Sequence, residues 1–271
     1  ANVRLANVAT GPEHPAIARA GALELLAGYP TLMSAFAAEK ALRDADPLVR
    51  RAAVTALQAL PPERRLPLLA PLLTDPVRSV RMEAASALAD AMQGADAGQQ
   101  RAFAKAAGEF EAAQKFNADT PEARTALGSF HARQGRLAKA EARLLSAMKL
   151  EPRYVPAYVN LADLYRAMGR DTDSERTLRD GLRQVPQSAE LHHALGLALV
   201  RLKRTPEAVA ELQRAARLAP ENPRYAYVLA VALNSTGQAP AALKELRRGL
   251  DRNPGNLDLL IAGASIGRES N

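Results

Sequence analysis

Histidine is the residue type in this sequence best suited to metal binding, haem ligation or acid–base chemistry. There are four histidines, His14, His131, His192 and His193. His192 and His193 are adjacent, so on a helix their side chains diverge by about 100° and cannot readily share one ligand. The spacings His-x-x-x-His and His-x-x-Glu-His, which place two metal ligands on one helix face, are absent. We therefore expect no metal site and no cofactor.

Motifs for nucleophilic or phosphoryl-transfer chemistry are equally sparse. Gly128 and Ser129 in the segment LGSF lie inside an expected helix, where the strained turn of a hydrolase nucleophile cannot form. Asp171 and Asp173 fall on an expected turn, and we expect Asp171 to cap a helix. Cysteine is absent, which excludes disulfides, thiolate metal sites and covalent haem attachment within this sequence. The sequence predicts a protein that is not an enzyme.

Composition favours helices throughout the chain. Ala, Leu and Arg dominate the 271 residues, Trp is absent, and no convincing strand pattern is found. A hydrophobic fraction of 48% is ordinary for a folded protein. No stretch approaches the roughly 18–20 uninterrupted apolar residues that a membrane span requires.

Charge is unevenly distributed along the chain. Acidic and basic residues balance over residues 1–96, so the net charge of +7 resides in residues 97–271. A nucleic-acid interface would gather basic side chains on one stripe with interleaved aromatics. Here the arginines alternate with Glu and Asp, which is typical of a solvated surface. Weak nucleic-acid binding through the basic part remains an alternative, and it predicts affinity that falls steeply with salt.

A 34-residue repeat occupies the second half of the chain. Four positions mark each repeat: a first leucine, a second leucine, a small residue three positions after the second leucine, and a proline. The first leucines are Leu127, Leu161, Leu195 and Leu229, and the second are Leu144, Leu178, Leu212 and Leu246. The small residues are Ala147, Gly181, Ala215 and Gly249, and the prolines are Pro152, Pro186, Pro220 and Pro254. Directly after the first leucine comes another small residue, one of Gly128, Ala162, Gly196 and Ala230. Large residues at these spacings are the knobs of two antiparallel helices, and small residues let the backbones approach. A turn separates the two helices, marked by Gly135, Gly169 and Gly237, with Lys203 in the corresponding place.

This pattern resembles the tetratricopeptide repeat (TPR), a helix–turn–helix unit of the same length. The resemblance covers four units over residues 121–254, with a joint and half-repeat helix over 92–120 and a truncated fifth repeat or capping helix over 255–271. It implies an all-α fold, a right-handed α–α superhelix of helix pairs. His131 and His192 take slots that pack against neighbouring helices in this family.

Residues 1–91 repeat differently. The segment 44–60 aligns with 75–91 at a spacing of 31 residues, and Val49 matches Val80, as Arg50 matches Arg81. A weaker copy spans 14–30, and 61–73 supplies the preceding helix of the last unit. An Asp-Pro pair suits a helix start, where Asp caps free N–H groups and Pro fits the first turn. These units resemble HEAT repeats.

The TPR resemblance implies a binding groove lined by the first helix of each pair. The slots that point inward in the family mark the candidate site, namely Arg133, Val159, Asn160, Asp163, His193, Leu197, Arg201, Tyr227, Val231 and Asn234. Asn suits peptide amides, Arg suits carboxylates, and Leu, Val and Tyr offer apolar anchors. The five slots of the chaperone-binding carboxylate clamp hold Thr125, Ser129, Asn160, Glu190 and Ala194, of which only Asn160 fits, so a chaperone tail is not the expected ligand.

The order of HEAT-like and then TPR pairs resembles the C-terminal portion of certain bacterial multihaem c-type cytochromes. That resemblance implies a periplasmic or extracytoplasmic setting and a candidate partner in a haem-bearing region of the same parent protein. We expect a non-catalytic scaffold that binds a protein or peptide in the concave TPR groove. The alternative is an assembly module of a larger redox protein, which predicts Cys-x-x-Cys-His motifs upstream.

Overall fold

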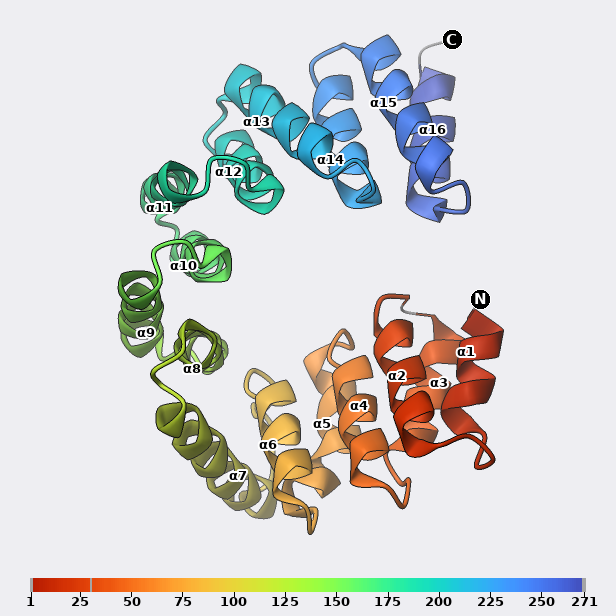
Figure 1. The fold of residues 1–271 in the computed structure, drawn as a ribbon, viewed down its shortest axis with the longest axis vertical. Coiled ribbons are helices and arrows are strands. Elements are labelled where there is room, and N and C mark those ends of the chain that lie inside the picture. The colour runs from red at the N-terminus through yellow and green to blue at the C-terminus, as the bar shows by residue number, and fades with distance from the viewer. Residues whose placement is uncertain (1, 30, 270–271) are drawn as a thin grey trace. The chain divides into compact units, whose positions relative to one another are not determined.

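The computed structural model describes residues 2–29 and 31–269. Within these residues the secondary structure is entirely helical, with short turns between helices, as the sequence predicts (Figure 1). The chain divides into two compact units, which are Ala1–Asp119 with Ser129–Arg136, and Thr120–Gly128 with Leu137–Asn271. We describe each unit by itself.

The first unit is an array of mostly short helices, in which every second helix from α2 to α6 begins at a regular spacing. Its elements are α1 (Asn2–Thr10), α2 (Ala16–Ala27), α3 (Leu32–Ala41), α4 (Pro47–Ala56), α5 (Pro62–Leu69), the 3-10 helix η1 (Ala70–Thr74), α6 (Arg78–Ala87) and α7 (Ala97–Phe116). Helices α2, α4 and α6 begin at residues 16, 47 and 78, a constant step of 31 residues, and α2 packs on α4 as α4 packs on α6.

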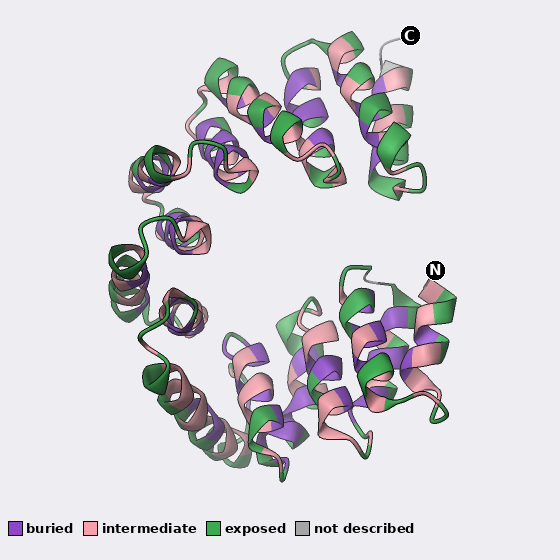
Figure 2. Ribbon diagram, viewed as in Figure 1, coloured by how far each residue is buried: buried purple, intermediate pink, exposed green. Residues whose placement is uncertain are grey.

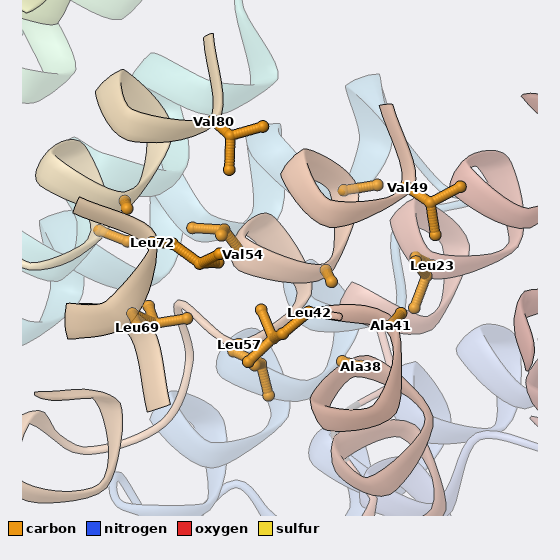
Figure 3. Packing of buried hydrophobic residues seen from close by; sticks show 14 of the residues in the cluster. Leu23, Ala38, Ala41, Leu42, Val49, Val54, Leu57, Leu69, Leu72 and Val80 are labelled. Carbon is orange, nitrogen blue, oxygen red and sulfur yellow. The ribbon is translucent and has the colours of Figure 1, made fainter. Parts of the chain in front are cut away.

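Residues that align in the sequence repeat form the core of this unit. Val49 and Val80, one repeat apart, are both fully buried, as are Leu57 and Leu88 to within 1%. Figure 3 shows how side chains from α2 to α6 meet in this cluster, with Val54 and Leu57 of the α4 segment among them. Small alanines fill the positions between these side chains, which lets the short helices approach closely.

The expected single helix over 61–73 is broken. It forms as α5, which contains Pro67, and then tightens into η1, whose second residue is Pro71. Proline removes a backbone donor and clashes with the preceding turn. Two prolines four residues apart therefore prevent one continuous α-helix.

Three arginines one repeat apart link successive helices of the first unit. Arg50 forms a bidentate ion pair with Asp75, at 2.7 and 2.9 Å, and also donates to the carbonyl oxygens of Asp44 and Ala45. Arg81 repeats this with Glu109 and the carbonyls of Asp75 and Pro76. Arg19 pairs with Asp44 through one guanidinium nitrogen only, while its Nε donates to the His14 carbonyl oxygen. We call these three pairs the arginine ladder.

The two Asp-Pro pairs of the first unit, at residues 46–47 and 75–76, behave differently at the helix starts. Asp46 is the N-cap of α4 and accepts from the Leu48 amide at 2.8 Å, with Pro47 in the first turn, as predicted. Asp75 precedes the N-cap of α6, which is Val77, and accepts from the Val77 amide. Its carboxylate is instead the partner of Arg50, so the second Asp-Pro pair serves the arginine ladder rather than a cap.

The second unit contains the helix pairs of the 34-residue repeat. Its elements are α8 (Pro121–Arg133), shared with the first unit, then α9 (Leu137–Leu150), α10 (Val155–Ala167), α11 (Asp171–Gln184), α12 (Ala189–Arg201), α13 (Thr205–Leu218), α14 (Pro223–Asn234), α15 (Ala239–Arg252) and α16 (Leu257–Glu269). The first helices contact one another, α10 with α12 and α14 with α16, and each also packs on the second helix of its own pair or of the preceding one. Buried residues follow the facing sides of the helices (Figure 2).

The turn inside each pair requires a left-handed backbone. Gly135, Gly169 and Gly237 have φ values of 71°, 71° and 75°. Lys203 occupies the same place with φ of 59° and is the one non-glycine residue with positive φ among those described. A β-carbon is unfavourable there, so the repeat imposes this conformation on a residue that does not favour it.

Small residues after the repeat leucine allow close helix contact, as predicted. A β-carbon on Gly196 would lie 2.6 Å from Leu212 Cγ and 3.3 Å from the Ala208 carbonyl oxygen. Gly128 has the same relation to Leu144, at 2.7 Å. In these two pairs the second-helix leucine occupies the volume where a side chain would otherwise be.

Candidate functional site

Two cavities open along the first helices of the second unit. The first, of about 570 Å³, lies among α10, α12 and α14 and reaches α11 through Ser174 and Leu178. The second, of about 410 Å³, lies between α14 and α16. Both have the mixed polar and apolar lining that is usual for ligand-binding hollows.

Most of the predicted site residues line these cavities. Those in the first cavity are Val159, Asp163, His193, Leu197 and Arg201. Those in the second are Tyr227, Val231 and Asn234. Asn160 and Arg133 line neither of the two. The helix spacing of the family slots therefore brings together eight of the ten residues, in two groups.

Arg133 belongs to the first unit and makes its contacts there. Its guanidinium donates to the Ser86 hydroxyl of α6 at 3.0 Å. Burial lowers the pKa of Arg133, and the nearby positive charge of Arg65 adds to this effect. The Arg133 side chain is therefore engaged within the first unit, a placement that the slot pattern did not predict.

His193 is the polar side chain buried most deeply at the first cavity after Ser174. It is only 8% exposed, and neither ring nitrogen has a hydrogen-bond partner within the described residues. Its ring contacts the Tyr225 ring, with centroids 4.6 Å apart. Burial, aided by the positive charge of Arg224, lowers the pKa of His193 to about 4. The imidazole is therefore neutral near pH 7 and presents one donor and one acceptor.

Two of the three arginines at the first cavity are neutralised by aspartates. Arg166 pairs with Asp163 on its own helix at 3.2 Å. Arg201 pairs with Asp171 at 2.8 Å. The prediction that Asp171 caps a helix is therefore wrong. Asp171 lies in the first turn of α11, and the N-cap residue is Arg170, whose side chain makes no capping hydrogen bond. An acidic residue there still suits the positive end of the helix dipole.

Arg224 and Glu190 remain without an ion pair among the residues described. Arg224 is exposed at the start of α14, and Glu190 is exposed at the start of α12. Loss of hydration raises the pKa of Glu190. The charge that the cavity offers to a ligand therefore comes from Arg224 and Glu190.

The other buried histidines have structural roles, as predicted. His192 is 4% exposed, and its ring nitrogens lie 2.5 Å from a Glu211 carboxylate oxygen and 3.0 Å from the Pro186 carbonyl oxygen. Tyr158, one repeat earlier, donates to the Pro152 carbonyl in the same manner. His131 is buried in the first unit beside Phe130.

Tyr225 and Ser174 were missed by the slot pattern. The Tyr225 ring contacts the His193 ring at a tilt of 35°. The Ser174 hydroxyl is buried at the cavity without a hydrogen-bond partner in the described chain. Ser174 had a signal in the sequence, because the equivalent positions Ala140, Ala208 and Ala242 carry no hydroxyl.

The described residues offer neither a metal site nor a membrane-spanning helix. They contain no group of three or more His, Cys, Asp or Glu side chains placed to hold a metal ion. No helix in the same part of the chain is long and apolar enough to cross a membrane.

Comparison with family models identifies the repeats. The tetratricopeptide repeat model matches residues 91–154, 159–223 and 193–256, which together make up more than half of the chain. The chain belongs to the tetratricopeptide repeat family. A HEAT repeat model matches residues 4–89, so the TPR region follows HEAT repeats, as the sequence indicates.

A solved TPR structure shares the fold. The chain is 27% identical to TTC0263, a thermophilic TPR protein of Thermus thermophilus, with a TM-score of 0.50 over 68% of this chain and 98% of that one. This likeness confirms the α–α superhelix class of the TPR array. MamA is 21% identical, with a TM-score of 0.47 over 53% of this chain and 84% of its own. No curated protein matches the chain.

Proposed function

We propose that this protein is a non-catalytic scaffold whose TPR array binds a segment of a partner protein along the first helices α10, α12 and α14. The observation that carries the proposal is the first cavity. It is lined by apolar side chains and by His193, whose imidazole has no hydrogen-bond partner among the described residues. Buried polar groups nearly always have a partner, so His193 is suited to accept one from outside the chain.

The lining fits a peptide better than a small hydrophobic ligand. Val159 and Leu197 provide an apolar wall, while His193 and Arg224 provide polar contacts. An extended or helical segment presents alternating side chains and backbone amides to such a surface. The second cavity, with Tyr227 and Val231, offers a further apolar anchor along α14 and α16.

The test compares two leucine variants of the full chain. Leu197→Asp places a charge in the first cavity, whereas Leu218→Asp makes the same change on α13, where Leu218 is 42% exposed and lies outside the two cavities. Both variants are checked by circular dichroism and used as baits in affinity capture from lysate of the source organism. We expect a partner that the wild type and Leu218→Asp retain and Leu197→Asp loses.

Other results of the capture would contradict this proposal. Equal retention by both variants would place the interface elsewhere on the chain. Retention of no specific partner by any bait would favour an assembly module within a larger protein, and the coding sequence upstream would then be searched for Cys-x-x-Cys-His motifs. Retention of nucleic acid that falls steeply with salt would favour the basic surface as the binding site.

A further inference from the structure

The first cavity contains two buried polar side chains without partners. His193 is 8% exposed and Ser174 is 1% exposed, and the ring nitrogens of one and the hydroxyl of the other lack hydrogen bonds within the described chain. Both residues line the cavity. Buried polar groups without hydrogen bonds destabilise the fold. A ligand that forms hydrogen bonds to them therefore gains binding free energy.

The charges around these groups select the chemistry of that ligand. Arg166 and Arg201 are paired with Asp163 and Asp171, which leaves Arg224 as the cation available at the cavity among the residues described. Arg224 lies close enough to His193 to influence its protonation. A guanidinium binds carboxylates in short, charge-assisted hydrogen bonds.

Glu190 is the opposing charge, and it does not cancel this preference. It is exposed at the cavity edge, and it forms no ion pair with Arg224 within the described residues. Residues 97–271, which contain the cavity, also hold the whole net charge of +7. The long-range field of this part of the chain therefore attracts acidic segments.

We propose that the first cavity is a subsite for a carboxylate of the bound partner segment, held by Arg224 with His193 donating from the cavity wall. This inference rests on the proposed function and specifies the chemistry of its ligand. The Tyr225 ring packs against the imidazole of His193, with centroids 4.6 Å apart and the ring planes tilted by 35°. Val159 and Leu197 contact the aliphatic part of the acidic residue.

The test uses short peptide probes and the full chain with ¹³C-labelled histidines. The probes are Ac-Ala-Ala-Glu-Ala-Ala-NH₂, its Gln analogue, and Ac-Ala-Ala-Ala-Ala-Ala with a free C-terminal carboxylate. The His193 ring resonance is assigned with His193→Gln and followed by NMR at pH 7. We expect the Glu peptide to move this resonance, and the Gln peptide to bind roughly ten-fold more weakly, the effect of one charge-assisted bond.

Two arginine variants keep the result interpretable. Arg224→Gln should weaken the Glu peptide roughly ten-fold. Arg214→Gln removes the same charge from an exposed position on α13 outside the cavity and should leave the affinity within about two-fold. Both side chains are exposed, so neither change is expected to unfold the chain. Tighter binding of the free C-terminal peptide would identify a chain end as the source of the carboxylate, and tighter binding of the Glu peptide would identify an internal acidic side chain.

Three results would overturn the carboxylate subsite. They are equal binding of the Glu and Gln peptides, binding that does not move the His193 resonance, and equal loss of affinity in both arginine variants. Each leaves the scaffold proposal to be decided by the leucine variants. If Leu197→Asp still loses the partner, the protein binds a segment there by contacts other than a carboxylate.

Discussion

Lys203 and His193 each depart from the residue type that their position favours. Lys203 adopts a left-handed backbone that three other repeats assign to glycine. His193 places a polar ring where it is almost fully buried, with no partner in the described part of the protein. Lys203 has no side-chain hydrogen bond or ion pair within the described residues that would compensate for its backbone conformation, whereas His193 lines a cavity.

Replacing Lys203 with glycine should stabilise the protein. The positive φ of 59° is unfavourable for any residue with a β-carbon, and relief of this strain should raise the free energy of unfolding by about 1 kcal/mol. Urea denaturation of Lys203→Gly measures the change. Lys203→Ala is the matched control, because alanine keeps the β-carbon and should give no gain; equal gains from both variants would contradict this account.

His193 should make the protein less stable in acid. Its pKa in the fold is about 4, below the ordinary value of 6.5, so between these values the unfolded chain binds a proton that the folded chain does not. The contribution of neutral His193 to the free energy of unfolding is therefore fully present above pH 6.5 and is lost as the pH falls toward 4. Allowing for solvent at the open side of the cavity, wild type should lose about 2 kcal/mol more than His193→Gln between pH 7 and 4.5. Denaturation curves at both pH values measure the difference, and parallel losses would argue against a buried neutral imidazole.

Different kinds of contact join the helices in the two units. In the first unit, the arginine ladder connects α2, α4, α6 and α7 through Asp44, Asp75 and Glu109. In the second unit, close backbone contact at Gly128 and Gly196 brings paired helices together. The ladder recurs at every 31-residue step of its repeat, whereas the glycine contacts recur at every second 34-residue step, with Ala162 and Ala230 at the other equivalent positions.

Breaking one step of the ladder should destabilise the first unit. Arg50→Met removes the bidentate pair and leaves the carboxylate of Asp75 buried, with its side chain 4% exposed. Burial by itself raises the pKa of Asp75, but hydrogen bonds from Arg50 and the Val77 amide outweigh it, so the pKa is lowered and the charge depends on Arg50. We expect a loss of about 3 kcal/mol in urea denaturation. Arg51→Met, at the next and exposed position, should change stability by less than about 0.5 kcal/mol.

Adding one methyl group between α12 and α13 should also destabilise the protein. In Gly196→Ala the new β-carbon would lie 2.6 Å from Leu212 Cγ, so the Leu212 side chain or one of the two helices must shift, at a cost of about 2 kcal/mol. Gly263→Ala in α16 is the control, because nothing lies within 4 Å of its β-carbon and alanine favours the helix. Thermal unfolding of both variants measures the difference. A stable Gly196→Ala variant would show that the helix contact is looser than described.

At the scale of the whole chain, contacts concentrate between neighbouring elements and divide into two compact units. In such arrays, stability is approximately a sum over repeats and the interfaces between neighbours. A destabilising change in one unit therefore acts mainly on that unit.

Hydrogen exchange should reveal this independence. In Arg50→Met we expect faster exchange at the amides of α2, α4 and α6, and unchanged exchange at those of α12 to α15, since local openings follow cooperative units. Exchange of peptides from both units, measured by mass spectrometry, gives the comparison. A uniform increase along the chain would mean that the two units unfold as one.

The repeat period by itself determined much of this protein. Helix pairs were predicted from Leu127 and its equivalents and from the glycines of the inner turns. These positions recur because each pair needs large and small residues for packing and a left-handed residue for its turn, and both requirements act within a few residues. The Asp-Pro pair at residues 46 and 47 likewise predicted the start of α4. The inward slots implied by the TPR resemblance correspond to eight residues that line the two cavities.

Only the tertiary structure decided which partner each polar side chain meets. Arg133 and Arg201 occupy groove slots of the family, yet Arg133 donates to Ser86 and Arg201 pairs with Asp171, residues on other helices. The ring contact between Tyr225 and His193 also joins two repeats. A local pattern determines the face of a helix on which a side chain lies. Its partners depend on which helices approach that face, and this is set by packing between residues far apart in the sequence.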